Sequence, residues 1–403
     1  MRKPTMTVLA ASLPDKRTRK PDSPPSWKPR IDIPLRDPSP EAEAQDQLVR
    51  RGRHLARQDA WDDLGREICA ADASRSLTPG LTPAALWLAR GARQDAVGAA
   101  RKAIARNEPN HARAAIRALE ANLEDMPDCP ALAFVVCNAH LDLARAWRGG
   151  LAMRGLSRLR RAAYDHHMRS AVELVEANDP FEQDSALWAM ARCAVLDADP
   201  APSQRVADDY EDLVDLDPRA ILHPMALGRD LLPRRFGSYE ALDLQARRTA
   251  SRTQDIWGQG GYTLVYMGAL ERDTGAMLRL DVELFCSGLH DIIDRFPDQH
   301  IVNRLAAFCG MTMSGGNPKD TVRGRIQNCF GWITADHMRE LHPAVWATAP
   351  VPSALQTHHP DNDAIRRGMS RALSALAECY SEHISTGHRL VFDGKGLSFV
   401  RAA

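Results

Sequence analysis

The stretch that decides the fold begins with YEDLVDLDPRAILHPMALGRDLLPRRFGSYEAL, residues 210–242, and ends with FPDQHIVNRLAAFC, residues 296–309. Its apolar residues recur at the spacing of amphipathic helices, and very short turns separate these helices. The clearest helix is expected to open at Asp281, where one apolar stripe contains Val282, Phe285, Leu289, Ile292, Ile293 and Phe296. The pattern therefore predicts an all-α fold.

The charge balance of the chain argues against a large nucleic-acid surface. Lys and Arg together number 52, as do Asp and Glu, so no overall basic surplus would attract a phosphate backbone. No apolar run approaches the roughly 18 to 20 residues that a membrane span needs. The eight cysteines form no CxxC pair, which favours free thiols in a reducing compartment. We therefore expect a cytoplasmic protein with no membrane partner, and we do not expect nucleic acid as its main partner.

Composition divides the chain into three parts. Residues 1–40 are rich in Pro and in basic residues and bury little apolar area, so they are expected to form a disordered basic leader. Residues 41–350 carry the helical pattern and should form one repeat domain. Residues 351–403 should add a final helix and a small β-hairpin, because Asp393-Gly394 lies between two alternating apolar segments.

Two Ala-rich helices are expected over residues 84–90 and 96–106, with Asp95 capping the second. Their many alanines predict close contact between helices rather than a wide ligand cavity. The segment DAVGAARKAIARNEPNHARA, residues 95–114, resembles the second helix of a tetratricopeptide repeat (TPR). It has small residues at Ala96 and at the position seven residues later, and a proline marks the following turn.

A second partial match to this repeat is VADDYEDLVDLDPRA, residues 206–220. Prolines also recur at intervals of 71 and 38 residues, at positions 109, 180 and 218. These intervals are near two units and one unit of a helix pair slightly longer than the roughly 34 residues of a standard repeat. The resemblance implies a TPR-like right-handed α-solenoid of antiparallel helix pairs.

A second resemblance rests on LARAWRGG, residues 143–150, and on the segment DLDPRAILHPMALGRDLLPRRFGSYEAL, residues 215–242. Both are similar to an uncharacterised bacterial domain-of-unknown-function family built from TPR-like helices. In that family an aromatic and Arg-Gly-Gly element precedes one helix, and a Leu-Leu-Pro-Arg turn followed by Gly-Ser precedes another. The resemblance covers about residues 140–255 and departs from the family at Phe236, where Gly is common. It implies a helical repeat fold and no particular activity.

A helical repeat of this kind predicts a non-enzymatic protein–protein interaction scaffold, because a solenoid exposes a long concave face that suits a peptide or a helix. The chain has no GxSxG, phosphate-loop, HExxH or CxxC motif, so we expect no catalytic residue, cofactor or metal. Leu231, Leu232 and Phe236 should pack between repeats and leave the neighbouring arginines available. The expected partner-binding residues are Arg234, Arg235, Trp257, Tyr262 and Tyr266.

The main alternative is an enzyme or a small-ligand sensor with a site near His290, His300 and the same three aromatic residues. A metal site is disfavoured, because its ligands would need a spacing of three or four residues on one helix face. His337 and His342 are five residues apart, and the adjacent histidine pairs point in different directions. A weaker alternative is nucleic-acid binding through the basic leader and the paired arginines.

Overall fold

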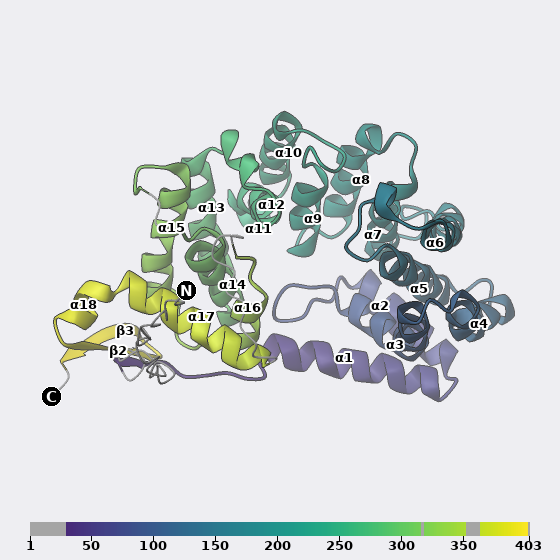
Figure 1. Ribbon diagram of the computed structural model, residues 1–403, viewed down its shortest axis with the longest axis horizontal. Coiled ribbons are helices and arrows are strands. Elements are labelled where there is room, and N and C mark those ends of the chain that lie inside the picture. The colour runs from purple at the N-terminus through teal and green to yellow at the C-terminus, as the bar shows by residue number, and fades with distance from the viewer. Residues whose placement is uncertain (1–29, 316–317, 352–362, 402–403) are drawn as a thin grey trace, which may run out of the picture.

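The computed structural model of the 403-residue chain describes residues 30–315, 318–351 and 363–401. Most of these residues are helical, and a small three-stranded sheet lies near the C-terminal end (Figure 1). The prediction of a mainly helical protein is therefore confirmed. Residues 1–29, where most of the predicted disordered leader falls, lie outside the described residues. Within the described ranges, no helix combines the length and the apolar character needed to cross a membrane.

The N-terminal part of the chain contains the first seven α-helices. Proline occupies the first turn of three of them, where its missing N–H costs no helical hydrogen bond. Ser39, Ser157 and Ser185 cap three helices by accepting a hydrogen bond from a backbone N–H of the first turn. The helices are α1 (Pro40–Arg57), α2 (Trp61–Ala73), α3 (Ala84–Ala105), α4 (Pro109–Asp125), α5 (Pro130–Arg148), α6 (Arg158–Glu176) and α7 (Ala186–Ala194).

Helix α3 is continuous where the sequence predicted two helices separated at Asp95. Asp95 does not cap a helix there, because its carboxylate pairs with Arg57 of α1 at 2.6 Å. Helices α1 and α3 also approach closely, since a Cβ atom on Gly91 would lie 2.1 Å from the backbone oxygen of Val49. The predicted close contact of the Ala-rich segment is thus present on the side of α3 that faces α1. The expectation that no wide cavity borders this segment is wrong, because residues of α3 line a hollow of about 630 Å³.

In the central part, the helix expected to open at Asp281 begins there. Ser238 caps α10 and Asp281 caps α13, each by accepting a hydrogen bond from the third residue of its helix. Gly258, with a φ of 57°, ends α11 in a backbone conformation that favours glycine. The helices are α8 (Pro202–Leu216), α9 (Leu222–Asp230), α10 (Tyr239–Arg252), α11 (Gln254–Trp257), α12 (Gly260–Leu270) and α13 (Val282–Arg295).

The C-terminal part confirms the predicted β-hairpin and adds a strand to it. Strands β2 (His388–Asp393) and β3 (Gly396–Arg401) are antiparallel, and Asp393 pairs with Gly396 next to the turn. Strand β1 (Ile31–Asp32) pairs with β2 in the parallel direction. The remaining helices are α14 (Gln299–Ala307), α15 (Val322–Trp332), α16 (Pro343–Thr348), α17 (Ala364–Cys379) and α18 (Ser381–Ser385).

Residues 30–41 join the two ends of the chain, although the sequence placed nearly all of them in the leader. The backbone of Leu341 donates to Pro34 at 2.8 Å and accepts from Arg36 at 2.9 Å. The buried carboxylate of Glu41 accepts hydrogen bonds from the Gly80 backbone and from the Thr78 hydroxyl. The segment therefore belongs to the folded body because its backbone and its first acidic side chain are hydrogen-bonded there.

The helices follow an arc, and α1 runs below it from the region of α16 to the region of α3 (Figure 1). The interior forms two hydrophobic clusters, which meet around α7. The first contains much of α1 to α7 and is rich in alanine, with Trp147 and Trp188 as its largest fully buried side chains. The second extends from α7 to the C-terminal sheet and includes Trp257 and Trp346. The aromatic residues of the central stretch belong to this second cluster.

Candidate functional site

Three neighbouring hollows are lined by helices of the N-terminal, central and C-terminal parts. The first, hollow A, has a volume of about 630 Å³ and lies between α3, α5 and α7. The second, hollow B, has a volume of about 520 Å³ and is lined by helices from α5 to α9. The third, hollow C, has a volume of about 370 Å³ and is lined mainly by α14, α16 and the residues that follow α12.

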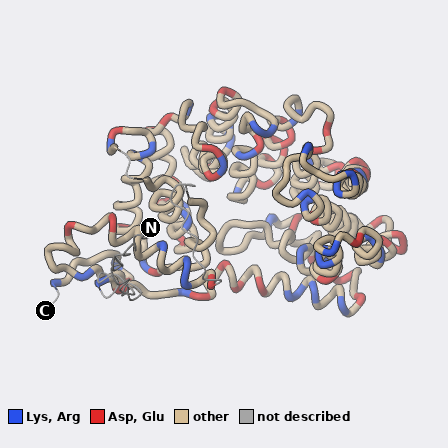
Figure 2. The backbone as a smooth tube through the Cα atoms, viewed as in Figure 1, with Lys and Arg blue, Asp and Glu red and all other residues tan. Residues whose placement is uncertain are grey.

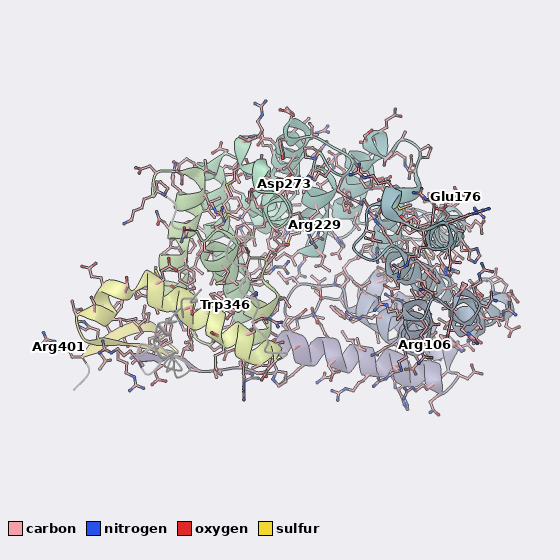
Figure 3. The ribbon with its side chains drawn as sticks, viewed as in Figure 1. Arg106, Glu176, Arg229, Asp273, Trp346 and Arg401 are labelled. Carbon is pink, nitrogen blue, oxygen red and sulfur yellow. The ribbon has the colours of Figure 1, made fainter. Side chains whose placement is uncertain are left out.

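The hollows are adjacent, because they share lining residues, and we call the three together the inner groove. Arg145, Met190 and Ala194 line both hollow A and hollow B. Arg272 lines both hollow B and hollow C. Figure 3 shows Arg229, a lining residue of hollow B, on the inner side of the arc, whereas Glu176 at the end of α6 lies on its outer side.

Arginine dominates the charge of the inner groove. Acidic and basic residues are interspersed along the described part of the chain in Figure 2, and the formal charge of the protein is zero. Among the described residues that line the groove, however, the carboxylates are only Asp142, Asp197, Asp230 and Glu271. The arginines number nine: Arg90, Arg93, Arg101, Arg145, Arg148, Arg229, Arg235, Arg272 and Arg304.

Two arginines whose pKa burial lowers lie at the two ends of the groove. Arg93 in hollow A has 6% of its surface exposed and donates from Nε to Asp142 at 2.8 Å. Arg304 in hollow C donates to the sulfur of Met225 at 2.8 Å. Burial lowers the pKa of both guanidinium groups, because removal from water penalises the cation, and nearby carboxylates act in the opposite direction. Both side chains remain charged, since arginine is not deprotonated in proteins.

The two predicted arginines of the 231–242 turn have different environments. Arg234 is exposed. Arg235 is partly buried, pairs with Asp230 at 3.0 Å and Asp197 at 2.7 Å, and lies over the ring of Phe236. Arg235 lines hollow B, so the structure places one of the two predicted arginines in the inner groove.

The three predicted aromatic residues are buried in the core, which corrects their assignment to a partner-binding surface. Trp257, Tyr262 and Tyr266 are each 0% exposed. The Trp257 indole donates to the backbone oxygen of Pro218, and both tyrosine hydroxyls donate to Asp243. Because their polar atoms are satisfied inside the protein, these side chains have no free group for a partner.

The histidines of the alternative site have separate neighbours. The ring of His290 is exposed and stacks on Trp332, with ring centroids 3.9 Å apart. His300 lines hollow C and lies beside His342, and burial lowers its pKa to about 4. The lining of hollow C includes neither His290 nor the three aromatic residues. Across the described ranges, no group of three or more His, Cys, Asp or Glu residues could hold a metal ion.

The structure also brings together groups that the sequence did not single out. Arg90, Arg93 and Arg101 lie on one face of α3, because positions separated by three, eight and eleven residues recur on the same side of a helix. That spacing was a usable signal within the Ala-rich segment. By contrast, Arg93 and Asp142 lie on two different helices and are 49 residues apart in sequence. No local sequence pattern therefore indicates that they pair.

Comparison of the chain with protein-family models, with curated proteins and with solved structures finds no match. The inner groove is therefore interpreted from its own residues.

Proposed function

We propose that this protein is a non-enzymatic protein–protein interaction scaffold, a TPR-like right-handed α-solenoid of antiparallel helix pairs that acts in the cytoplasm. Its partner is a peptide or helix, which binds along the inner groove. The observation that carries the proposal is the adjacency of three arginine-rich hollows, which share lining residues. The eight free cysteines support a reducing compartment.

Hydrogen bonds between residues about forty positions apart support the repeat architecture. The Trp257 indole donates to Pro218, 39 residues earlier. The Asn303 amide donates to Glu340, 37 residues later, and the Thr312 hydroxyl donates to Pro350, 38 residues later. Such a recurring interval is expected when each helix pair contacts the next pair, and it is close to the length of known helical repeats.

The charge of the groove supports an acidic partner. Nine lining arginines face four lining carboxylates, so an acidic peptide would balance charges that the protein itself leaves uncompensated. The guanidinium group is suited to this role because its planar donors bind carboxylates in a fixed geometry. Apolar lining residues such as Leu141, Met168 and Leu222 in hollow B provide contacts for the rest of the peptide.

The proposal is tested by screening a library of 15-residue peptides and measuring the affinity of the best acidic binder. Arg145→Glu and Arg272→Glu reverse charge at the two junctions between hollows, where both side chains are exposed. Each change should weaken the acidic peptide by about tenfold or more, because like charges in an interface cost several kcal/mol. The affinity should also fall as salt concentration rises.

Arg401→Glu is the matched control, because this substitution makes the same charge change at the exposed end of β3, far from the groove (Figure 3). This variant should bind the peptide as the parent protein does. If all three variants bind equally, the peptide does not occupy the groove and the proposal fails. Selection of neutral or basic peptides that ignore the two groove variants would contradict it as well.

A further inference from the structure

The floor of hollow A contains a buried arginine side chain whose charge and hydrogen-bond donors are only partly matched by neighbouring groups. The Arg93 side chain is 8% exposed, and its Nη1 atom is buried without a hydrogen-bond partner among the described residues. Its Nε atom pairs with Asp142, which leaves part of the guanidinium donor set unused. A buried polar atom normally has a partner, so an unused donor that borders a hollow points to a group that binds there.

One carboxylate serves three arginines in this hollow. Asp142 lies 2.8 Å from Arg93, 3.7 Å from Arg101 and 3.9 Å from Arg145. Arg90 adds a fourth cation and lies over the ring of Trp87 at 5.1 Å from its centroid. Asp142 is the only acidic side chain among the described residues that line hollow A. The local charge is therefore strongly positive in a protein whose total charge is zero.

The rest of the hollow is apolar. Leu86, Trp87, Val97, Phe134 and Met190 lie among its lining residues. The volume of about 630 Å³ is within the range of about 300 to 1,000 Å³ that is typical of small-ligand sites. A ligand that fits this hollow has an anionic group for the arginines and an apolar or aromatic part for the wall.

We propose that hollow A is a binding site for a phosphate monoester that carries an apolar or aromatic group. A phosphate monoester has a charge between about −1.5 and −2 at neutral pH and three acceptor oxygens. It thus balances more of the local charge than a single carboxylate does, and it can accept from several guanidinium groups at once. Arg93 binds the phosphate at the base of the hollow, and Arg90, Arg101 and Arg145 approach it from the rim.

This inference goes beyond the scaffold function and does not require it. The same phosphate chemistry could come from a free phosphorylated compound or from a phosphorylated side chain of a partner. Binding of a small phosphate ester would therefore support the site even if no peptide follows the rest of the groove.

The site is tested by calorimetric titration of the full chain with three probes: inorganic phosphate, phenyl phosphate, and a ten-residue phosphotyrosine peptide beside its unphosphorylated form. Phenyl phosphate should bind at least about tenfold more tightly than inorganic phosphate, because the ring adds burial of apolar area. Arg93→Met should weaken phenyl phosphate by about tenfold or more through loss of a charge-assisted hydrogen bond. Arg145→Gln provides a second, exposed position if Arg93→Met does not fold, and Arg401→Gln is the control.

Tighter binding of the phosphopeptide than of phenyl phosphate would assign the phosphate to a partner protein, and the reverse order would assign it to a small molecule. Both results support the site. The proposal is overturned if none of the phosphorylated probes binds at millimolar concentration. It is also overturned if the affinity is the same in the parent protein, Arg93→Met and Arg145→Gln, or if the unphosphorylated peptide binds as well as the phosphopeptide.

Discussion

Arginines on the outer surface of the arc and arginines in the inner groove are held in different ways. On the outer surface, Arg252 pairs with Glu211 at 2.8 Å and with Asp215 at 2.6 Å, and Arg279 pairs with Glu240 at 2.7 Å. These partners lie 37 to 41 residues apart and link one helix to another. In hollow A, three arginines share the single carboxylate of Asp142.

The difference shows that a neutral chain can keep a local charge surplus. The outer surface balances its arginines with nearby carboxylates. Because these ion pairs are exposed, water screens them and they contribute little to stability. The groove places a buried arginine beside too few acids, which costs free energy unless a ligand or a shared carboxylate compensates. Such uncompensated charge supports the binding role that we propose for the groove.

Removal of the shared carboxylate of Asp142 should cause the largest loss of stability. Asp142→Asn keeps the shape of the side chain but leaves the buried Arg93 without its anionic partner. We expect the free energy of unfolding to fall by about 3 kcal/mol, since loss of one member of a buried pair strands the other charge. Urea unfolding curves measure this change through the shift of the midpoint at constant slope.

Arg93→Met is the informative control for that experiment. It removes the buried cation and leaves Asp142 within 4 Å of Arg101 and Arg145, at 3.7 and 3.9 Å. Its free energy of unfolding should stay within about 1 kcal/mol of the parent value, because an apolar side chain replaces a poorly compensated charge. Equal destabilisation by both variants would mean that Arg93 and Asp142 form an ordinary structural pair.

A second test uses buried histidines. A histidine becomes neutral when it is buried, whereas a buried arginine keeps its charge. His140 and His167 are buried, with their Nδ1 atoms 3.0 Å apart. Burial is the main cause that lowers the pKa of His140 to about 4 and that of His167 to about 3. The unfolded chain therefore binds protons between its histidine pKa of about 6.5 and these values, whereas the folded protein does not.

Stability should accordingly be constant with respect to these two groups above about pH 7.5 and should fall as the pH drops below about 6.5. At pH 5.5 each histidine should cost about 1.4 kcal/mol of unfolding free energy. His167→Gln removes one titrating group, so the loss between pH 7.5 and pH 5.5 should be smaller by about that amount. An unchanged loss in this variant, measured by urea unfolding at both pH values, would show that His167 is not buried in its neutral form.

The smallest loss of stability is expected for a substitution on the outer surface. Arg252→Ala breaks two ion pairs, but the Arg252 side chain is 39% exposed and Asp215 is 52% exposed. The free energy of unfolding should fall by less than about 1 kcal/mol, and the difference should shrink in 1 M salt. A loss as large as that of Asp142→Asn would remove the distinction between the two surfaces.

The parts of the fold that depend on neighbouring residues could be predicted from the sequence. The cap Asp281 and the hairpin turn at Asp393-Gly394 were predicted, because each uses contacts within a few residues. The continuity of α3 was not predicted, because the Asp95 carboxylate pairs with Arg57, 38 residues earlier. The third strand was missed for the same reason, since Ile31 pairs with Leu390 at the other end of the chain.

The candidate site was less predictable than the fold. Trp257 and Tyr262 are of residue types that are common in interfaces, but their polar atoms form hydrogen bonds to Pro218 and Asp243 in the core. Periodicity does not distinguish a helix face that packs against another helix from one that binds a partner. Arg235 was identified from its turn, whereas Arg93 was missed because its environment depends on three helices that meet only in the folded protein.

The most direct measurement of peptide binding in the inner groove is a hydrogen-exchange footprint of the full chain with the selected acidic 15-residue peptide. Helices α3, α5, α7 and α9 contribute most of the residues that line hollows A and B, and their backbone amides should become protected when the peptide binds. The outer helices α4 and α10, which line none of the three hollows, should exchange as in the free protein (Figure 1). Protection confined to those outer helices, or to the C-terminal sheet, would contradict binding in the groove.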